Sequence, residues 1–214
     1  VMMRAAARYG LDLPDRQLCC APVKSHPGRE YLAAMAAAAN YAWANRQIMM
    51  HLARKSLEQT LGTPAAPLDV RLVYDVCHNI AKFEMHEING ERRRLCVHRK
   101  GATRAFPGDR EEVPDAYRHV GQPVLVPGDM GTGSWVCAGT GKAMRETFGS
   151  ACHGAGRVMS RTSARKGENA AALLRELEEQ GVIVMARSKK TVTEESPSAY
   201  KDIDAVTAVL DTAG

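Results

Sequence analysis

Residues 73–107 read VYDVCHNIAKFEMHEINGERRRLCVHRKGATRAFP, and this stretch decides the fold class. Its centre, Asn89-Gly90, stands between two strand-like runs that mix charged and apolar residues, over 84–87 and 94–98. An Asn-Gly pair in such a setting is a strong local signal for a two-residue hairpin turn. The stretch is therefore predicted to form an antiparallel β-hairpin.

Helical and strand patterns surround this hairpin. Residues 28–61 are rich in Ala, contain no Pro and place apolar side chains at helical spacing, so we expect one long helix or two joined helices that end at Gly62. The other expected elements are strands over 70–74, 124–126, 134–138 and 182–185, an exposed loop over 107–121, and helices over 167–180 and 202–210. The predicted class is α/β (α+β), with mixed sheets and flanking helices.

Length and composition indicate an ordinary globular protein. The chain has 214 residues, 45% of them apolar and 25% charged, which suffices for one sizeable core or two small ones. No apolar run is long enough to span a bilayer, so no membrane association is expected. The net charge of +5 is compatible with a polyanionic partner. Six cysteines without CxxC spacing favour reduced, buried thiols and a cytoplasmic location.

Three segments contain residues that suit a binding site better than a core. Residues 75–79 place His78 at the end of an apolar run, where an imidazole could bind a transition metal or simply bond a neighbouring backbone group. Residues 98–106 combine four potential cations, Lys100 among them, with a Gly, as a phosphate-binding loop or a solvated turn would. Residues 127–134 hold three glycines, which suit either a nucleotide cradle or a tight hairpin.

A fourth segment, residues 149–161, carries the strongest signal. His153 is followed by Gly154-Ala155-Gly156, a stretch that leaves the ring accessible and can present N–H groups to an anion. Arg157 can bind a phosphate through two parallel hydrogen bonds. Histidine can act as a covalent nucleophile, and phosphoryl or nucleotidyl transfer needs cations around the transferred phosphate.

Together these segments resemble the RtcB-type RNA ligases. The resemblance rests on the consecutive strings VYDVCHNIAKFE, VHRKGATRAFP, GQPVLVPGDMGTGSWV, TFGSACHGAGRVMSR and ESPSAYKDID, with LPDRQLCCAP and AMAAAANYAWANRQ before them. It extends over essentially the whole chain in the family's order. The set of strings is highly specific, whereas each string alone is weak.

The resemblance implies a GTP- and Mn²⁺-dependent enzyme that joins RNA 2′,3′-cyclic phosphate or 3′-phosphate ends to 5′-hydroxyl ends, as in tRNA splicing and RNA repair. It implies that His153 becomes guanylated and that His78 binds Mn²⁺. The nucleotide or RNA phosphates would be bound by Gly154, Ala155, Gly156, Arg157 and Lys100, and the guanine base by Ser134 and Tyr200. Asp129 belongs to the same set, although some members carry Ser there. Implied partners are RNA (tRNA halves or broken ends), GTP and archease, an activator that many members use.

The chain departs from the family at its ends, where a metal-binding N-terminal half and a short C-terminal tail are absent from residues 1–214. We therefore expect a partial catalytic domain that is inactive by itself. Two alternatives from other classes remain open: a non-catalytic RNA- or nucleotide-binding fragment, and a metal-dependent phosphohydrolase that reuses His78 and His153.

Overall fold

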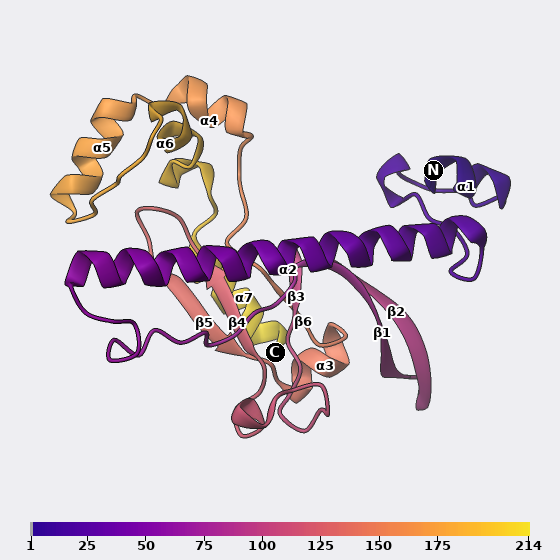
Figure 1. Cartoon of the computed structure of the whole chain (residues 1–214). Helices are drawn as coiled ribbons and strands as arrows, with labels where there is room; N and C mark the ends of the chain where they lie inside the picture. The colour runs from indigo at the N-terminus through magenta and orange to yellow at the C-terminus, as the bar shows by residue number, and fades with distance from the viewer. Residues whose placement is uncertain (1) are drawn as a thin grey trace. The chain divides into compact units, whose positions relative to one another are not determined.

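The computed structural model describes residues 2–214, which divide into two compact units with the boundary between Asp75 and Val76 (Figure 1). Helices and small antiparallel sheets are both present, which confirms the predicted α+β mixture. Within residues 2–214, none of the helices combines the length and the apolar character that crossing a bilayer requires. All six cysteines are free thiols, as expected, but five are half-buried rather than buried, and Cys20 is exposed.

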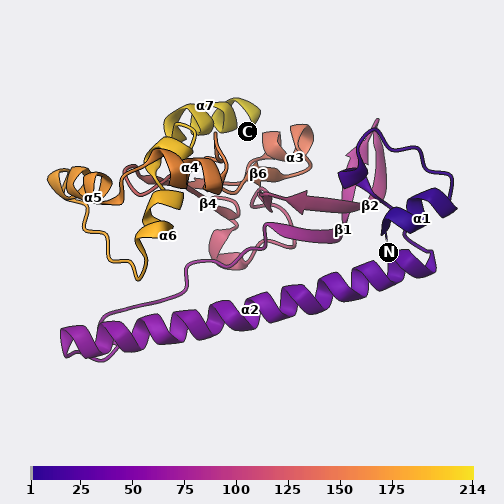
Figure 2. The ribbon, with the colours of Figure 1, turned by 90° about the horizontal axis from the view of Figure 1, so that it is seen from above.

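The first unit is built around α2, which runs from His26 to Leu61. Ser25 caps the first turn by accepting a hydrogen bond from the amide of Gly28, and Gly62 ends the helix in the left-handed conformation, with φ of 61°. The helix predicted over 28–61 is confirmed, and Figures 1 and 2 show it as one continuous helix. Two unpredicted elements precede it, α1 (Met2–Arg8) and the short 3-10 helix η1 (Arg16–Leu18).

Residues 70–77 belong to no helix or strand, so the strand predicted over 70–74 is wrong. Side chains of α2 hold this segment instead of a neighbouring strand. Arg54 donates to the carbonyl oxygen of Val70 at 2.9 Å, and Arg46 forms an ion pair with Asp75 at 2.7 Å. The carbonyl oxygen of Val70 thus has a side-chain donor where a strand would offer a backbone donor. The apolar run alone therefore did not identify a strand.

The hairpin opens the second unit and is longer than the sequence pattern indicated. Strands β1 (Asn79–Ile88) and β2 (Glu91–Lys100) pair antiparallel over their full length, so that Ile88 faces Glu91 and Asn79 faces Lys100. Asn89 and Gly90 both have positive φ, 53° and 81°, as a tight primed hairpin turn requires. The predicted hairpin is confirmed.

Two further antiparallel pairs complete the sheets: β3 (Ala102–Arg104) with β6 (Ser150–Cys152), and β4 (Pro123–Pro127) with β5 (Ser134–Ala138). The predicted strands over 124–126 and 134–138 are confirmed, whereas β3 and β6 were not predicted. The segment over 107–121 is a loop apart from the 3-10 helix η2 (Asp115–Tyr117). The main core gathers around these strands and consists of Ala105, Val124, Val126, Ala155 and Ile203.

The helices of the second unit are α3 (Gly141–Glu146), α4 (Arg161–Gly167), α5 (Ala170–Glu179), α6 (Lys189–Glu194) and α7 (Ile203–Ala213), with η3 (Pro197–Ala199) before α7. The predictions over 167–180 and 202–210 are confirmed by α5 and α7. The strand predicted over 182–185 is wrong. Val182 and Val184 pack against the small core under α5, while Ile183 and Met185 are exposed, so the alternation reflects packing on a helix.

Candidate functional site

Antiparallel pairing brings His153 against Gly101. Ala102 of β3 faces Cys152 of β6 in an antiparallel pair. Gly101, just before β3, therefore lies beside His153, just after β6. His153 Nδ1 lies 2.6 Å from the carbonyl oxygen of Gly101. Gly101 has φ of 69°, and a Cβ atom there would lie 3.4 Å from Cε1 of His153, so glycine suits this position for two reasons.

This hydrogen bond fixes the tautomer of His153. A carbonyl oxygen can only accept, so Nδ1 must carry the proton. The lone pair of the neutral ring is then on Nε2, and the side chain of His153 is exposed. The arrangement therefore presents an oriented nitrogen nucleophile at the surface of the second unit.

His78 lies directly against His153. The two imidazole rings are stacked, with centroids 4.9 Å apart and planes 6° from parallel. The amide of Gly101 donates to the carbonyl oxygen of His78 at 3.0 Å and to the side chain of Asn79 at 3.2 Å, so Gly101 holds both histidines. Lys100, the residue before Gly101, is exposed at the end of β2. The structure thus brings the predicted residues His78 and His153 into contact, and Lys100 adjoins Gly101 in the chain.

A buried ion-pair network supports the segment that leads into β6. Arg99 donates to both carboxylate oxygens of Glu84, at 2.8 and 2.9 Å, and also to Ser150 Oγ at 2.9 Å and the carbonyl oxygen of Phe148 at 2.9 Å. His86 lies 3.1 Å from the same carboxylate. Burial alone would raise the pKa of Glu84, but the hydrogen bonds and charge of Arg99 hold that pKa below its ordinary value. The sequence pattern did not reveal this network.

The same network changes the expectation for residues 98–106. Arg99 is buried in its ion pair, and Arg104 donates to Gln122 at 3.0 Å with its guanidinium 4.8 Å from the ring of Phe106. These two cations are structural, so they are not placed to bind a ligand. The exposed basic side chains of the segment are those of His98 and Lys100.

The loop after His153 is tied to both neighbouring segments. The amide of Ala155 donates to the carbonyl oxygen of Pro127 at 2.9 Å, and the amide of Lys201 donates to the carbonyl oxygen of Gly156 at 2.9 Å. The N–H group of Ala155 is therefore already used within the protein, and its side chain is buried in the core. Gly154 lies close to Pro127, and a Cβ atom on residue 154 would lie 3.3 Å from the carbonyl oxygen of Pro127.

Three of the predicted nucleotide-binding residues line one cavity. It measures about 720 Å³ and includes Asp129, Ser134 and Tyr200, which is within the ordinary size range for small-molecule sites. The cavity also includes residues that the sequence reasoning missed, namely Trp135, Asp202 and Asp204. Trp135 donates to Asp204 at 3.0 Å. Both aspartates belong to the string ESPSAYKDID, so the family motif could have identified them as candidate site residues.

Arg157, in the loop after His153, is tied to Tyr200, which lines this cavity. Their backbones pair as an isolated bridge, and the guanidinium lies 4.8 Å from the Tyr200 ring. The guanidinium donates to the Tyr200 hydroxyl at 3.0 Å, to Glu195 at 3.3 Å, and to the carbonyl oxygens of Met159 at 3.1 Å and Glu194 at 2.6 Å. Burial, and then a hydrogen bond to Glu195, raise the pKa of Tyr200. Most of the donor capacity of Arg157 is therefore used within the protein.

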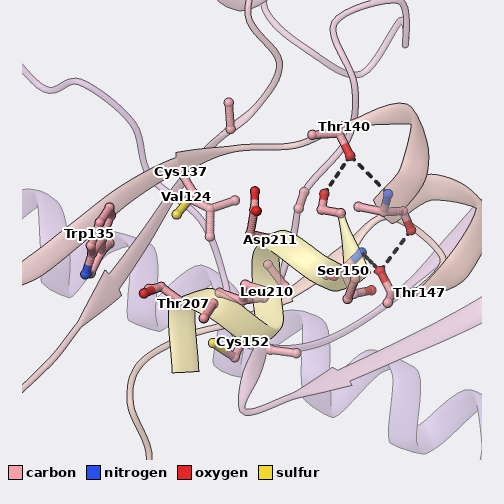
Figure 3. A pocket seen from close by; sticks show the side chains of 18 of the residues that line it. Val124, Trp135, Cys137, Thr140, Thr147, Ser150, Cys152, Thr207, Leu210 and Asp211 are labelled. Atoms are coloured by element: carbon pink, nitrogen blue, oxygen red, sulfur yellow. Dashed lines mark hydrogen bonds between the residues drawn. The ribbon is translucent and has the colours of Figure 1, made fainter. Parts of the chain in front are cut away.

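A second cavity of about 770 Å³ lies among β5, β6, α3 and α7 (Figure 3). Its lining is largely apolar and includes Cys137, Cys152 and Leu210. The hydroxyl groups on its wall already have protein partners: Thr140 bonds the carbonyl oxygen of Gly214, and Thr147 that of Ser150. Its chemistry does not suit a polyphosphate, so the smaller cavity is the better candidate for a nucleotide.

The described residues only partly fit a bound Mn²⁺ ion. His78 offers an imidazole, which is a suitable ligand for this class of metal. Among residues 2–214, however, no group of three or more His, Cys, Asp or Glu side chains converges on one point. A tightly held ion would need further ligands, since a catalytic metal site requires several.

Comparisons with known proteins agree with the quoted motifs. The family model described as tRNA-splicing ligase RtcB matches residues 1–214. Proteins named tRNA-splicing ligase RtcB from Archaeoglobus fulgidus and Thermococcus kodakarensis are 53% and 50% identical over 214 residues, and one from Methanocaldococcus jannaschii is 50% identical. All of this chain is covered in each case. The chain spans 44% of the first two relatives and 22% of the third.

Proposed function

Because this chain belongs to the RtcB family, we propose that it carries the nucleophile and part of the nucleotide site of a GTP- and Mn²⁺-dependent RNA ligase. The whole protein would join RNA 2′,3′-cyclic phosphate or 3′-phosphate ends to 5′-hydroxyl ends, in tRNA splicing or RNA repair. The observation that supports this most strongly is the hydrogen bond from His153 Nδ1 to Gly101, which leaves Nε2 free to attack.

In the proposed first step, Nε2 of His153 forms a bond to the α-phosphorus of GTP. The bond from that phosphorus to the bridging oxygen breaks, and pyrophosphate leaves with the electron pair. Positive charge develops on the imidazole, and the carbonyl oxygen of Gly101 stabilises it through the Nδ1 proton. His153 thereby becomes guanylated.

The remaining residues of the site would bind and orient the reactants. Ser134 is suited to hydrogen-bond guanine and Tyr200 to contact its ring, in a cavity that Asp129 also lines. Lys100 would neutralise phosphate charge beside His153. Arg157 is suited to act mainly by positioning Tyr200 and less by binding phosphate, since its donors already have protein partners.

Mn²⁺, when bound, would neutralise the triphosphate and favour loss of pyrophosphate. His78 would supply one of its ligands. Gly154, Ala155 and Gly156 would shape the loop beside the nucleotide, although the N–H group of Ala155 is used by Pro127. An archease-type activator and a cytoplasmic location remain predictions from the family resemblance.

A ligation assay separates this proposal from its alternatives. The full-length protein would be incubated with GTP, Mn²⁺, an RNA that ends in a 3′-phosphate or cyclic phosphate, and an RNA that begins with a 5′-hydroxyl. A ligase gives joined RNA that disappears in a His153→Ala variant. Loss of the terminal phosphate without joining would instead indicate a phosphohydrolase, and retention of unchanged RNA a binding protein.

A further inference from the structure

The two faces of the β1–β2 hairpin differ in what they contact. One face carries Glu84, His86 and Arg99, which are buried together. That face packs on the rest of the second unit, because Arg99 reaches Ser150 and His86 lies against the ring of Phe148. Most side chains of the opposite face, which we call the outward face, are exposed, although Ala81 is buried there. Both views show the hairpin reaching away from the other strands of this unit (Figures 1 and 2).

The outward face carries a row of cations along β2. Because side chains alternate across a strand, Arg92, Arg94, His98 and Lys100 share this face, and all four are exposed. Glu87, opposite Arg92, is the one acidic residue at these positions. The row therefore carries three fixed positive charges against one negative charge. We call these four residues the cationic row.

Arginines on the two faces differ in their partners. Arg93 on the inward face forms an ion pair with Glu91 at 2.8 Å, and Arg99 is paired with Glu84. Within the described part of the chain, neither Arg92 nor Arg94 forms an ion pair of this kind. The guanidinium of Arg94 instead lies 4.8 Å from the ring of Phe83, which is 45% exposed on the same face.

The cationic row leads directly to the nucleophile. Its last member, Lys100, precedes Gly101, whose carbonyl oxygen is bonded to His153. With a rise of about 3.4 Å per residue, the eight steps from Arg92 to Lys100 span roughly 27 Å, enough for several nucleotides. Cations that follow a backbone, combined with an exposed aromatic ring, are the usual means of binding single-stranded nucleic acid.

We propose that the outward face of the β1–β2 hairpin binds the single-stranded end of the RNA substrate and leads it to His153. Arg92, Arg94 and Lys100 contact successive phosphates, and Phe83 stacks on a base. This inference rests on the proposed ligase function, since it names where that enzyme's substrate lies. The occupant is RNA because the face offers fixed positive charge beside an exposed aromatic ring.

Binding of a fluorescent single-stranded RNA with a 3′-phosphate, measured by anisotropy at several salt concentrations, tests the proposal in the full-length protein. In the Arg92→Ala/Arg94→Ala variant we expect several-fold weaker binding. The slope of log affinity against log salt should fall by about 1.4, since each lost phosphate contact contributes about 0.7 for a single strand. The Arg92→Lys/Arg94→Lys variant retains the charge and should retain the slope.

Arg93→Ala is the matched control, because it removes an arginine from the same strand on the opposite face. It should bind RNA as the unmodified protein does. Equal affinity and equal salt slope in the Arg92→Ala/Arg94→Ala variant and in the unmodified protein would overturn the proposal, and so would an equal loss in Arg93→Ala. A Phe83→Leu variant should lose affinity at every salt concentration without a change in slope.

The two proposals fail in different ways. Guanylation of His153 by GTP needs no RNA, so its absence in the unmodified protein would contradict the ligase function and leave the RNA-binding result standing. Normal guanylation together with unchanged RNA binding in the Arg92→Ala/Arg94→Ala variant would contradict the RNA path alone. Thermal unfolding of each variant checks that the hairpin remains folded.

Discussion

Gly101 accepts a hydrogen bond from Nδ1 of His153 at 2.6 Å, and its amide donates to the carbonyl oxygen of His78 at 3.0 Å. One glycine thus sets the tautomer of His153 and bonds its stacked neighbour, His78. Neither β3 nor β6 is longer than three residues, yet their pairing is sufficient to place this contact. The chemistry proposed for His153 depends on that short pairing.

A Gly101→Ala substitution should reduce guanylation about tenfold or more. The added methyl group strains a left-handed backbone by about 1–2 kcal/mol and comes into contact with the ring of His153. Gly90→Ala is the control, because Gly90 has φ of 81° in open space at the hairpin turn. Both variants should lose stability in urea unfolding, and only Gly101→Ala should lose labelling by GTP. Equal labelling in the two would show that the contact with His153 does not matter.

Removing one partner of the buried pair should destabilise the second unit. Arg99→Leu leaves the carboxylate of Glu84 buried without its partner, which costs about 3–5 kcal/mol. Arg93→Leu breaks an exposed pair and should cost about 0–1 kcal/mol. Denaturant unfolding measures both. A small effect for Arg99→Leu would mean that water or a neighbouring group replaces the guanidinium.

The stability of the second unit should depend on pH through Glu84. Its pKa is held below the ordinary value of 4.5 in the folded protein, so the unfolded state binds the proton more readily. The stabilisation is complete above about pH 4.5 and is lost as pH falls from there through the lower folded pKa. Unfolding free energies measured between pH 3 and pH 7 should therefore decline more steeply in the unmodified protein than in Glu84→Gln. Parallel curves would contradict this role.

Lys100 and Arg157 should respond differently to truncation. Lys100 is exposed beside Gly101, so Lys100→Ala should leave the melting temperature unchanged and slow ligation by one to two decades, the equivalent of about 1.5–3 kcal/mol. Arg157→Ala should lower the melting temperature as well, because Glu195 and Tyr200 lose their shared partner. An unchanged melting temperature in Arg157→Ala would restore a role in binding phosphate.

Much of the fold could be predicted from local patterns, because the long helix α2, the hairpin turn at Asn89-Gly90 and helix α7 each carry strong signals in a few residues. The two failures, over 70–74 and 182–185, were apolar runs. Over 182–185 alternate side chains pack against a helix, and over 70–74 Leu72 and Val73 are exposed. Apolar character alone therefore did not identify a strand in either segment.

The motifs named candidate site residues but not the contacts among them. His78 stacks on His153, and Ser134 shares a cavity with Tyr200. The pairing of Arg99 with Glu84 could not be predicted, since the two residues are 15 positions apart and look like ordinary surface charges in sequence.

The most direct test is to locate the guanylate. The full-length protein would be incubated with α-³²P-GTP and Mn²⁺, and the labelled peptide would be identified by mass spectrometry under alkaline conditions, because a phosphoramidate is labile in acid. The account predicts one GMP adduct on His153, absent from His153→Ala and retained in His119→Ala, which removes an exposed histidine elsewhere in the second unit. Label that persists in His153→Ala, or an adduct on another residue, would contradict it.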